Sequence, residues 1–217
     1  MLEKVKGRRA YDSPLRREQA DATRHAILNA ARMLFTQRGY VATPIQAIAY
    51  QAGVSAATVY ASFANKRTVL ASLVDVAIAG DDEPNPILQR AWVNDLREAP
   101  DPRGRIALLA RYGRRILERR APIDAVVSAA AATDPDIAAL WRQLQEQRHA
   151  GQRALLQIVI GDDGSLRSGL SLARASDVLY AIGSPETYRL LVEDRGWSAA
   201  RFERWYADTL ERLLLDN

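Results

Sequence analysis

The 217-residue sequence contains no cysteine and only two histidines. Without cysteine it cannot form disulfides, thiolate metal sites or thiol redox centres. Its basic N-terminus has no apolar segment behind it, so a secretion signal is not expected and a cytoplasmic location is predicted. No apolar run approaches the roughly 18 residues that cross a bilayer. Hydrophobic residues still make up 48% of the chain, which is enough to form a packed core.

Residues suited to catalysis are also few. His25 and His149 are far apart in the sequence, and no cluster has the spacing of metal ligands. The Gly-Asp-Asp-Gly-Ser segment at 161–165 lacks the Gly-Lys-Ser/Thr of a phosphate loop and is expected to form a turn. The sequence therefore predicts no cofactor, no metal and no enzymatic activity. Catalysis by loop carboxylates is the least favoured alternative.

The charge is unevenly divided along the chain. Residues 1–70 contain 11 basic and 4 acidic residues, a net charge of +7, whereas residues 71–217 contain 19 basic and 22 acidic residues, a net charge of −3. A basic segment on a mildly acidic body indicates that the first third meets a polyanion. A merely solvated basic segment would have the same composition, so charge alone leaves both interpretations open.

Nearly every segment has helical periodicity, because apolar residues recur at i, i+3, i+4 and i+7 and no segment alternates as a strand does. The predicted fold class is all-α. Pro185 is expected to break the helix that starts at Ser171. The other helices are predicted over about 17–38, 44–52, 55–63, 65–79, 87–98, 103–120, 122–132 and 135–160, with a final helix after Ser198.

The first three predicted helices form a recognisable unit. Thr43 is a plausible N-cap of the short second helix, with Pro44 at its first position. Gly53 can adopt the positive φ of a sharp turn, and Ser55 can cap the third helix, whose first N–H groups would face outward. A long helix followed by two short helices around a tight turn is a helix-turn-helix. Its predicted core contains Ile27, Ala30, Ala31, Leu34, Phe35, Ile48, Val54 and Val59.

Twelve positions of this segment fit one known pattern: Thr43, Ile45, Ile48, Ala49, Ala52, Gly53, Val54, Ser55, Thr58, Tyr60, Phe63 and Lys66. In these residues the segment resembles the DNA-binding region of the TetR-type transcriptional regulators. The resemblance implies an N-terminal helix-turn-helix domain followed by a larger helical domain for effector binding and dimerisation. We therefore expect a flexible basic arm at 1–16, a DNA-binding domain at 17–64 and an effector and dimerisation domain at 65–217.

The resemblance also implies roles in DNA contact. Thr43, Tyr60 and Lys66 would contact phosphates, and residues near Ser55–Thr58 would face base edges in the major groove. Tyr60 has the alternative of being a core aromatic residue. The basic residues of the arm at 1–16 either follow a minor groove or stay solvated.

The sequence departs from the family pattern at several of these positions. Pro44 replaces a threonine, and alanines stand where larger or polar residues are common. The third helix is therefore expected to read thymine methyl groups and DNA shape more than guanine. The predicted DNA-binding residues are Thr43, Pro44, Ser55, Ala56, Ala57, Thr58, Tyr60, Ala61 and Lys66.

Apolar residues of the middle helices are candidates for an effector pocket, although each could equally be ordinary core. Their mostly apolar character indicates a hydrophobic or aromatic small molecule. The predicted lining residues are Trp92, Tyr112, Ile116, Val127, Trp141, Leu144 and Tyr180.

Wide apolar stripes mark the last helix and the helix that begins at Ser171. The resemblance implies that these two helices pair with their copies in a homodimer, as a four-helix interface. The alternative is that the stripes face only their own core. The predicted interface residues are Leu172, Ala175, Leu179, Ile182, Phe202, Trp205, Tyr206, Leu210 and Leu213.

The predicted function is that of a homodimeric, sequence-specific transcriptional regulator. It would act as a repressor that a small-molecule effector releases from a palindromic operator in double-stranded DNA. The runner-up is an all-helical partner-binding protein that has lost specific DNA binding, because the alanine-rich third helix offers few hydrogen-bonding groups.

Overall fold

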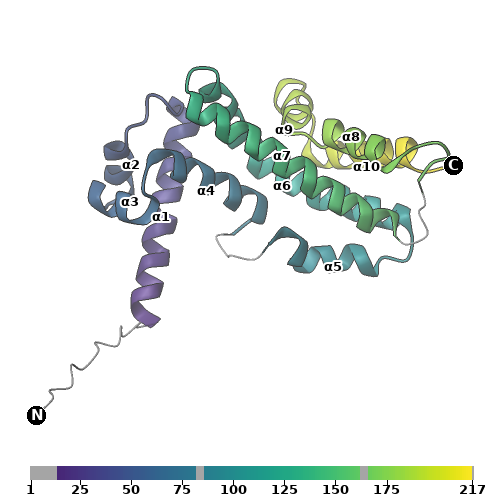
Figure 1. Ribbon diagram of the computed structural model, residues 1–217, viewed down its shortest axis with the longest axis horizontal. Coiled ribbons are helices and arrows are strands. Elements are labelled where there is room, and N and C mark those ends of the chain that lie inside the picture. Colours follow the sequence, from purple (N-terminus) through teal and green to yellow (C-terminus); the bar gives the residue numbers. More distant parts are fainter. Residues whose placement is uncertain (1–13, 82–85, 162–165, 217) are drawn as a thin grey trace, which may run out of the picture.

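The computed structural model describes residues 14–81, 86–161 and 166–216. All regular structure within these ranges is helical, which confirms the predicted all-α class (Figure 1). The α-helices are α1 (Pro14–Arg38), α2 (Ile45–Ala52), α3 (Ala56–Phe63), α4 (Lys66–Ala79), α5 (Ala91–Glu98), α6 (Pro102–Ala131), α7 (Pro135–Ile160), α8 (Leu172–Ile182), α9 (Pro185–Tyr188) and α10 (Ala199–Leu214). A 3-10 turn at Ile87–Gln89 and a π-helical segment at Arg189–Asp194 complete the regular structure of the described ranges.

Two groups of buried side chains hold these helices together. The first group comes from α1–α4 and from residues 123–130 of α6 and 137–144 of α7. The second comes from α5, α8, α9, α10 and the remaining halves of α6 and α7. The long antiparallel helices α6 and α7 belong to both groups. They therefore join the N-terminal unit, formed by α1–α3, to the helices of the second core, here called the body (Figure 1). Helix α4 shares the first core, and the domain boundary placed at residue 64 stays a prediction.

The prediction of two separate helices over 103–120 and 122–132 is wrong. Helix α6 is continuous, with Pro122 in its interior. Proline removes one backbone hydrogen bond from a helix and usually ends it. Here Leu117 and Ala121 before it, and Ile123 and Val126 after it, are all buried. Packing on both sides of the proline outweighs the lost hydrogen bond.

The other helix boundaries agree more closely with the sequence. The predicted helix over 87–98 divides into the 3-10 turn and α5, because Arg90 between them has an extended backbone. The break at Pro185 is confirmed: α8 ends at Ile182, and Ser184 caps the short α9 through the N–H of Thr187.

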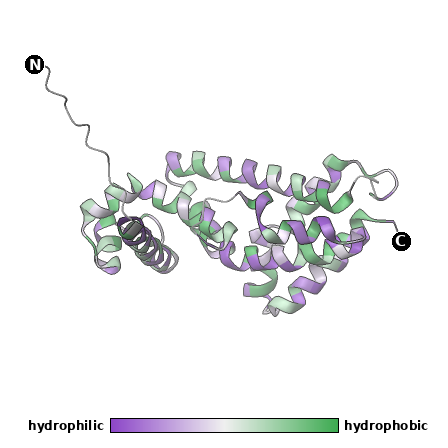
Figure 2. Cartoon of the chain, turned by 90° about the horizontal axis from the view of Figure 1, so that it is seen from below, coloured by the Kyte–Doolittle hydropathy of each residue, from purple (hydrophilic) through white to green (hydrophobic). Residues whose placement is uncertain are grey.

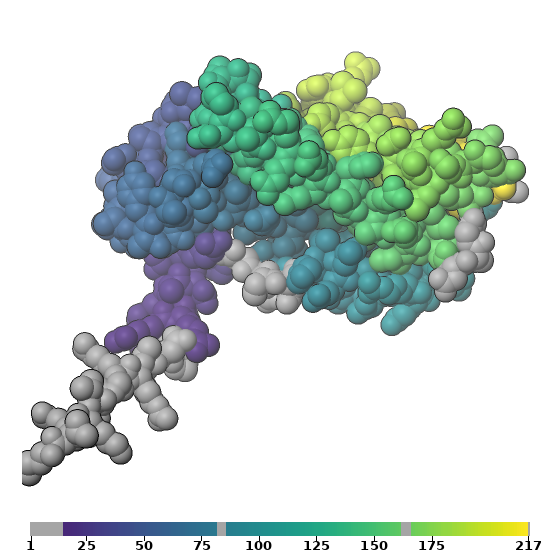
Figure 3. All heavy atoms as spheres, viewed as in Figure 1, coloured from purple at the N-terminus to yellow at the C-terminus, as the bar shows by residue number. Residues whose placement is uncertain are grey.

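Surface character varies along the molecule. Hydrophilic and hydrophobic residues alternate along the long helices (Figure 2), and no helix of the described ranges is long and apolar enough to cross a membrane. Residues 15–22 at the start of α1 are exposed, and this end of the helix projects from the body (Figure 3). Residues 1–13 of the predicted arm lie outside the described residues, and residues 14–16, also predicted as arm, belong to α1.

Candidate nucleic-acid interface and effector cavity

The N-terminal unit has the packing that a helix-turn-helix requires. Apolar side chains from α1, α2 and α3 meet in its interior, and Val69 and Leu70 of α4 close the same core. The predicted core is confirmed, except that Val54 is only half-buried. The buried members are Ile27, Ala30, Ala31, Leu34, Phe35, Ile48 and Val59.

The turn between α2 and α3 is built by Gly53 and Ser55. Gly53 has φ +69°, and its N–H donates to the carbonyls of Ala49 and Tyr50. This left-handed conformation favours glycine because a Cβ atom would clash with the backbone. The Ser55 hydroxyl then accepts a hydrogen bond from the Thr58 N–H at 3.0 Å and caps α3. The predicted turn and cap are confirmed.

One face of α3 is exposed to solvent. Ala57, Tyr60 and Ala61 lie on it at i, i+3 and i+4, and 49% of the Tyr60 surface is accessible. The hydroxyls of Ser55 and Thr58 are bonded to each other at 2.8 Å at the start of the helix. An exposed, largely apolar face with a single phenol suits methyl contacts and one phosphate contact better than bidentate base recognition.

Thr43 occupies a different position from the one predicted. It is fully buried, and its hydroxyl donates to the Gly39 carbonyl at 2.8 Å. The prediction that it caps the second helix is wrong, because the exposed Pro44 stands at the N-cap position and no side chain caps α2. The hydroxyl is turned inward toward carbonyls of α1 and its following turn, so it is unavailable to the α2 amides. Phosphate contact by Thr43 stays a prediction.

Lys66 begins α4 and ties it to the turn after α1. Its ammonium donates to the Tyr40 carbonyl at 2.9 Å and lies 4.2 Å from the centre of the Tyr40 ring. Burial lowers the pKa of Lys66, opposed by the attraction of Asp134. An ammonium has three N–H donors, so the contact with Tyr40 leaves others for the predicted phosphate.

The sequence analysis did not single out Tyr50, the most exposed large side chain near the turn. It lies on α2 with 88% of its surface accessible, beside the buried Ile48 and Ala49. Helical periodicity could have identified it, because Ile45, Ile48 and Ala49 define the buried face of α2 and Tyr50 falls outside it.

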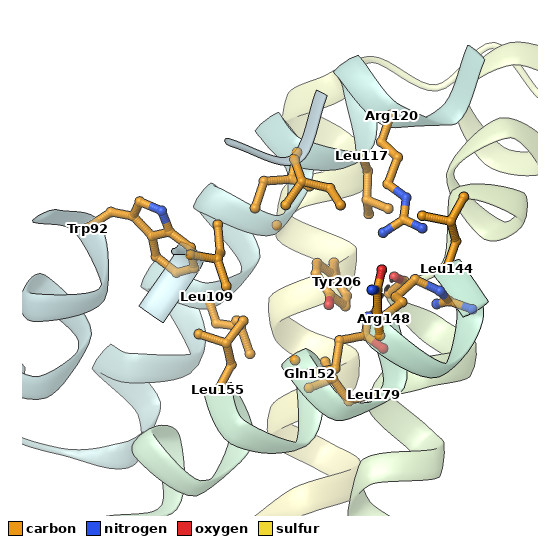
Figure 4. Close-up of a pocket in the computed structure, with 17 residues that line it drawn as sticks. Trp92, Leu109, Leu117, Arg120, Leu144, Arg148, Gln152, Leu155, Leu179 and Tyr206 are labelled. Atoms are coloured by element: carbon orange, nitrogen blue, oxygen red, sulfur yellow. Dashed lines mark hydrogen bonds between the residues drawn. The ribbon is translucent and has the colours of Figure 1, made fainter. Parts of the chain in front are cut away.

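A cavity of about 250 Å³ lies among the helices of the second core (Figure 4). Most of its lining is apolar. Three of the predicted effector residues, Trp92, Ile116 and Leu144, belong to the lining. The other four lie outside it: Tyr112 stacks on Trp92, Val127 and Trp141 pack in the first core, and Tyr180 lies beneath the guanidinium of Arg148.

Several lining residues escaped the sequence analysis. Gly113, Gly151 and Gly183 belong to the lining. The space beside Gly151 is open, whereas Tyr206 packs closely on Gly113 and a Cβ at Gly183 would collide with the Tyr206 hydroxyl. Glycine inside a long helix has a propensity cost, which was an available signal at Gly113 and Gly151. Arg120 could not be distinguished by sequence from the other arginines of its helix.

Two arginines lie at one end of the cavity, and Trp92 lies at the other (Figure 4). Arg120 Nε donates to Asp124 Oδ2 at 2.8 Å, with side-chain exposures of 5% and 1%. Burial raises the pKa of Asp124, and the nearby Arg120 opposes this shift. Arg148 donates to Gln145 Oε1 and to the Tyr180 carbonyl, both at 2.9 Å.

The predicted dimer stripes are largely used within the chain. In α8 and α10 the more exposed members are Leu172, Ile182, Trp205 and Leu213, with 40% of the Leu213 surface accessible. The remaining members are buried in the second core, and the role of the whole set in a dimer stays a prediction. These buried residues are Ala175, Leu179, Phe202, Tyr206 and Leu210.

Comparison with known proteins gives consistent results. Residues 27–73 match the family described as bacterial regulatory proteins, tetR family. No curated protein matches the sequence. The fold is similar to NalD, the secondary repressor of the MexAB-OprM multidrug efflux pump in Pseudomonas aeruginosa, with a TM-score of 0.64 and 22% identity over 92% of this chain and 99% of that one.

Two other similar structures contain ligands. FadR from Bacillus subtilis in complex with stearoyl-CoA has a TM-score of 0.67 and 20% identity over 86% of this chain and 96% of that one. A regulator from Saccharomonospora viridis in complex with choline has a TM-score of 0.65 and 20% identity over 89% and 98% of the two chains. Residues 27–73 therefore resemble the tetR family of bacterial regulatory proteins, and the whole chain shares its fold with the solved regulators named above.

Proposed function

We propose that the protein is a dimeric repressor that binds a palindromic operator and leaves it when a small molecule fills the cavity. The exposed face of α3, presented by the Ser55-capped turn, is the observation that carries the DNA-binding part. In this proposal Tyr60 contacts a phosphate, Ala57 and Ala61 approach base edges, and the basic residues of the first third supply salt-dependent attraction.

Dimerisation follows from the geometry of the target. One helix-turn-helix covers a single half-site, and two must be placed about 34–36 Å apart to meet successive major grooves. We assign this role to α8 and α10, which pack against each other and expose apolar side chains such as Leu213.

A direct path connects the cavity to the N-terminal unit. Arg119 on α6 donates from Nε to the Ala77 carbonyl at 2.9 Å and from Nη2 to the Ile78 carbonyl at 3.3 Å. These carbonyls belong to the last turn of α4, whose first turn is tied to Tyr40 by Lys66. The Ile78 side chain also lines the cavity. A ligand that displaces α6 or Ile78 would therefore move α4 and the helix-turn-helix that packs against it.

A gel-shift assay with the DNA upstream of the protein's own gene tests the proposal. We expect sequence-selective binding that weakens as salt increases. Tyr60→Phe should weaken binding by about tenfold or more on every sequence, because a hydrogen bond to a charged phosphate contributes about 1.5–3 kcal/mol. Tyr112→Phe, which removes a phenol far from α3, is the matched control.

Each result of this assay favours a different function. Equal affinity for all DNA would refute specific recognition, and no affinity would favour the partner-binding alternative. Unchanged affinity of the Tyr60→Phe protein would show that the phenol serves only in packing.

A further inference from the structure

The polar end of the cavity has an imbalance of charge. Arg120 and Arg148 both line it, whereas Asp124 is the one buried carboxylate paired with them in the described structure. Glu186 also acts on this cluster, but it is exposed on α9, where water screens its charge. The buried cluster therefore carries one positive charge more than its buried carboxylate neutralises, which is costly away from water.

Hydrogen bonding in this cluster is incomplete. Among the described residues, Arg120 Nη2 and Asp124 Oδ1 are both buried without a hydrogen-bond partner, although Arg120 Nε is bonded to Asp124 Oδ2. Of these two residues, Arg120 lines the cavity and Asp124 does not. Gln152 Nε2 donates to the Gly183 carbonyl at 3.0 Å, and its Oε1 is buried without a partner. Buried polar groups are normally satisfied, so an unsatisfied guanidinium in a cavity wall indicates an acceptor supplied by a ligand.

Arg148 is fixed in a position from which it can bind the same acceptor. Arg148 is fixed by its bonds to Gln145 and the Tyr180 carbonyl, with its guanidinium 3.6 Å from the centre of the Tyr180 ring. Side chains anchored in this way lose little conformational entropy when they bind a carboxylate.

We propose that the cavity binds a small, largely apolar carboxylic acid, with its carboxylate on Arg120 and Arg148 and its apolar part directed toward Trp92. This inference rests on the proposed function, because it assigns a chemical class to the effector. The volume of about 250 Å³ lies between the roughly 150 Å³ that hold benzene and the 300–1,000 Å³ of drug-sized sites. Gln152 Oε1 stays available to a donor on the ligand.

Calorimetric titration of the full-length protein with octanoate, 1-octanol and octylamine tests the assignment. The three probes share one apolar chain and differ in their head group. We expect octanoate to bind about tenfold or more tightly than 1-octanol, and octylamine to bind least, because a charge-assisted hydrogen bond is worth about twice a neutral one.

Variants of the arginines identify the site of the carboxylate. Arg120→Gln with Asp124→Asn removes the pair without leaving an unpaired carboxylate, and Arg148→Gln provides a second, independent variant. Both should reduce octanoate affinity to about that of 1-octanol while 1-octanol binding stays unchanged. Arg114→Gln is the matched control, because Arg114 lies on the same helix but pairs with Glu118 and Glu203 outside the cavity.

Three results would overturn the assignment: equal affinity for octanoate and 1-octanol, unchanged octanoate affinity in both arginine variants, or no octanoate binding at millimolar concentration. Gel shifts on the same preparations separate this inference from the proposed function. Octanoate selectivity in a protein that does not bind DNA would refute the repressor but keep the acid site. Specific DNA binding without octanoate selectivity would do the reverse.

Discussion

Tyr40, in the turn after α1, makes the stability of the N-terminal helices depend on pH. Its ring is buried against Phe35, with centroids 5.5 Å apart, and it supports the Lys66 ammonium. Burial, reinforced by Asp134 and opposed by Arg67, raises the pKa of Tyr40 from 10.0 to about 12. Between these values the unfolded chain loses the phenol proton and the folded chain keeps it, so rising pH favours unfolding.

We expect this contribution of Tyr40 to stability to be complete below pH 10 and lost by about pH 12. The melting temperature of the Tyr40→Phe protein should therefore fall less between pH 9.5 and 11 than that of the wild type, as measured by circular dichroism. Tyr50→Phe is the control, because the Tyr50 ring is exposed and Lys66 is present in all three proteins. Parallel pH curves for Tyr40→Phe and wild type would contradict the expectation.

At single residues, sequence predicts backbone roles better than side-chain directions. Gly53 and Ser55 do what their chemistry favours locally. Thr43 does not. Its hydroxyl could either accept from the α2 amides or donate to a carbonyl, and in the structure it donates to the nearby carbonyls of α1 and the following turn. The role of Arg120 depends on helices distant in sequence, which local pattern cannot place.

At the scale of the element, Gly151 in α7 is informative because nothing occupies the space beside it. A Cβ at this position meets no atom within 4 Å, and the residue lines the cavity. Gly151→Ala should increase the free energy of unfolding by about 0.5–1 kcal/mol through helix propensity. The expected rise in melting temperature is about 1–4 °C, with weaker binding of apolar ligands.

Gly113→Ala is the matched control on α6. A Cβ there would lie 3.1 Å from Cε1 of Tyr206, so the propensity gain is offset by a close contact. Equal stabilisation by both alanines would contradict the expectation that the contact with Tyr206 offsets the propensity gain at Gly113.

Periodicity predicts a helix correctly where its ends are set by local caps. The prediction is wrong where tertiary packing sets the end of the helix. Ser171 and Ser198 begin α8 and α10 as their sequences predict. Pro122 favours a local break, but packing of α6 in both cores keeps the helix continuous. The sequence alone does not show that both halves of α6 are packed.

At the scale of the molecule, the proposed dimer is the property most open to test. Leu213 is exposed on α10, and burying a glutamate there against a second copy would be costly. Light scattering should give the wild type a mass near twice 24.1 kDa and the Leu213→Glu protein a mass near one chain. DNA affinity should fall as well, because a single helix-turn-helix contacts only one half-site.

Ala139→Glu controls for the added charge, because Ala139 is exposed on α7 and lies outside the proposed interface. A wild-type mass near 24.1 kDa would exclude the dimer. Loss of the dimer in both variants would place the contact elsewhere.

In the proposed repressor, the adjacency of Arg119 and Arg120 has a consequence for gene control. One side chain holds the last turn of α4, and the next lines the cavity. If ligand and DNA favour different positions of this pair, each must lower the affinity of the other by the same factor. A promoter with a tighter operator would then need a higher effector concentration for release. Operators of graded strength would open in order, from the weakest to the strongest, as one metabolite accumulates.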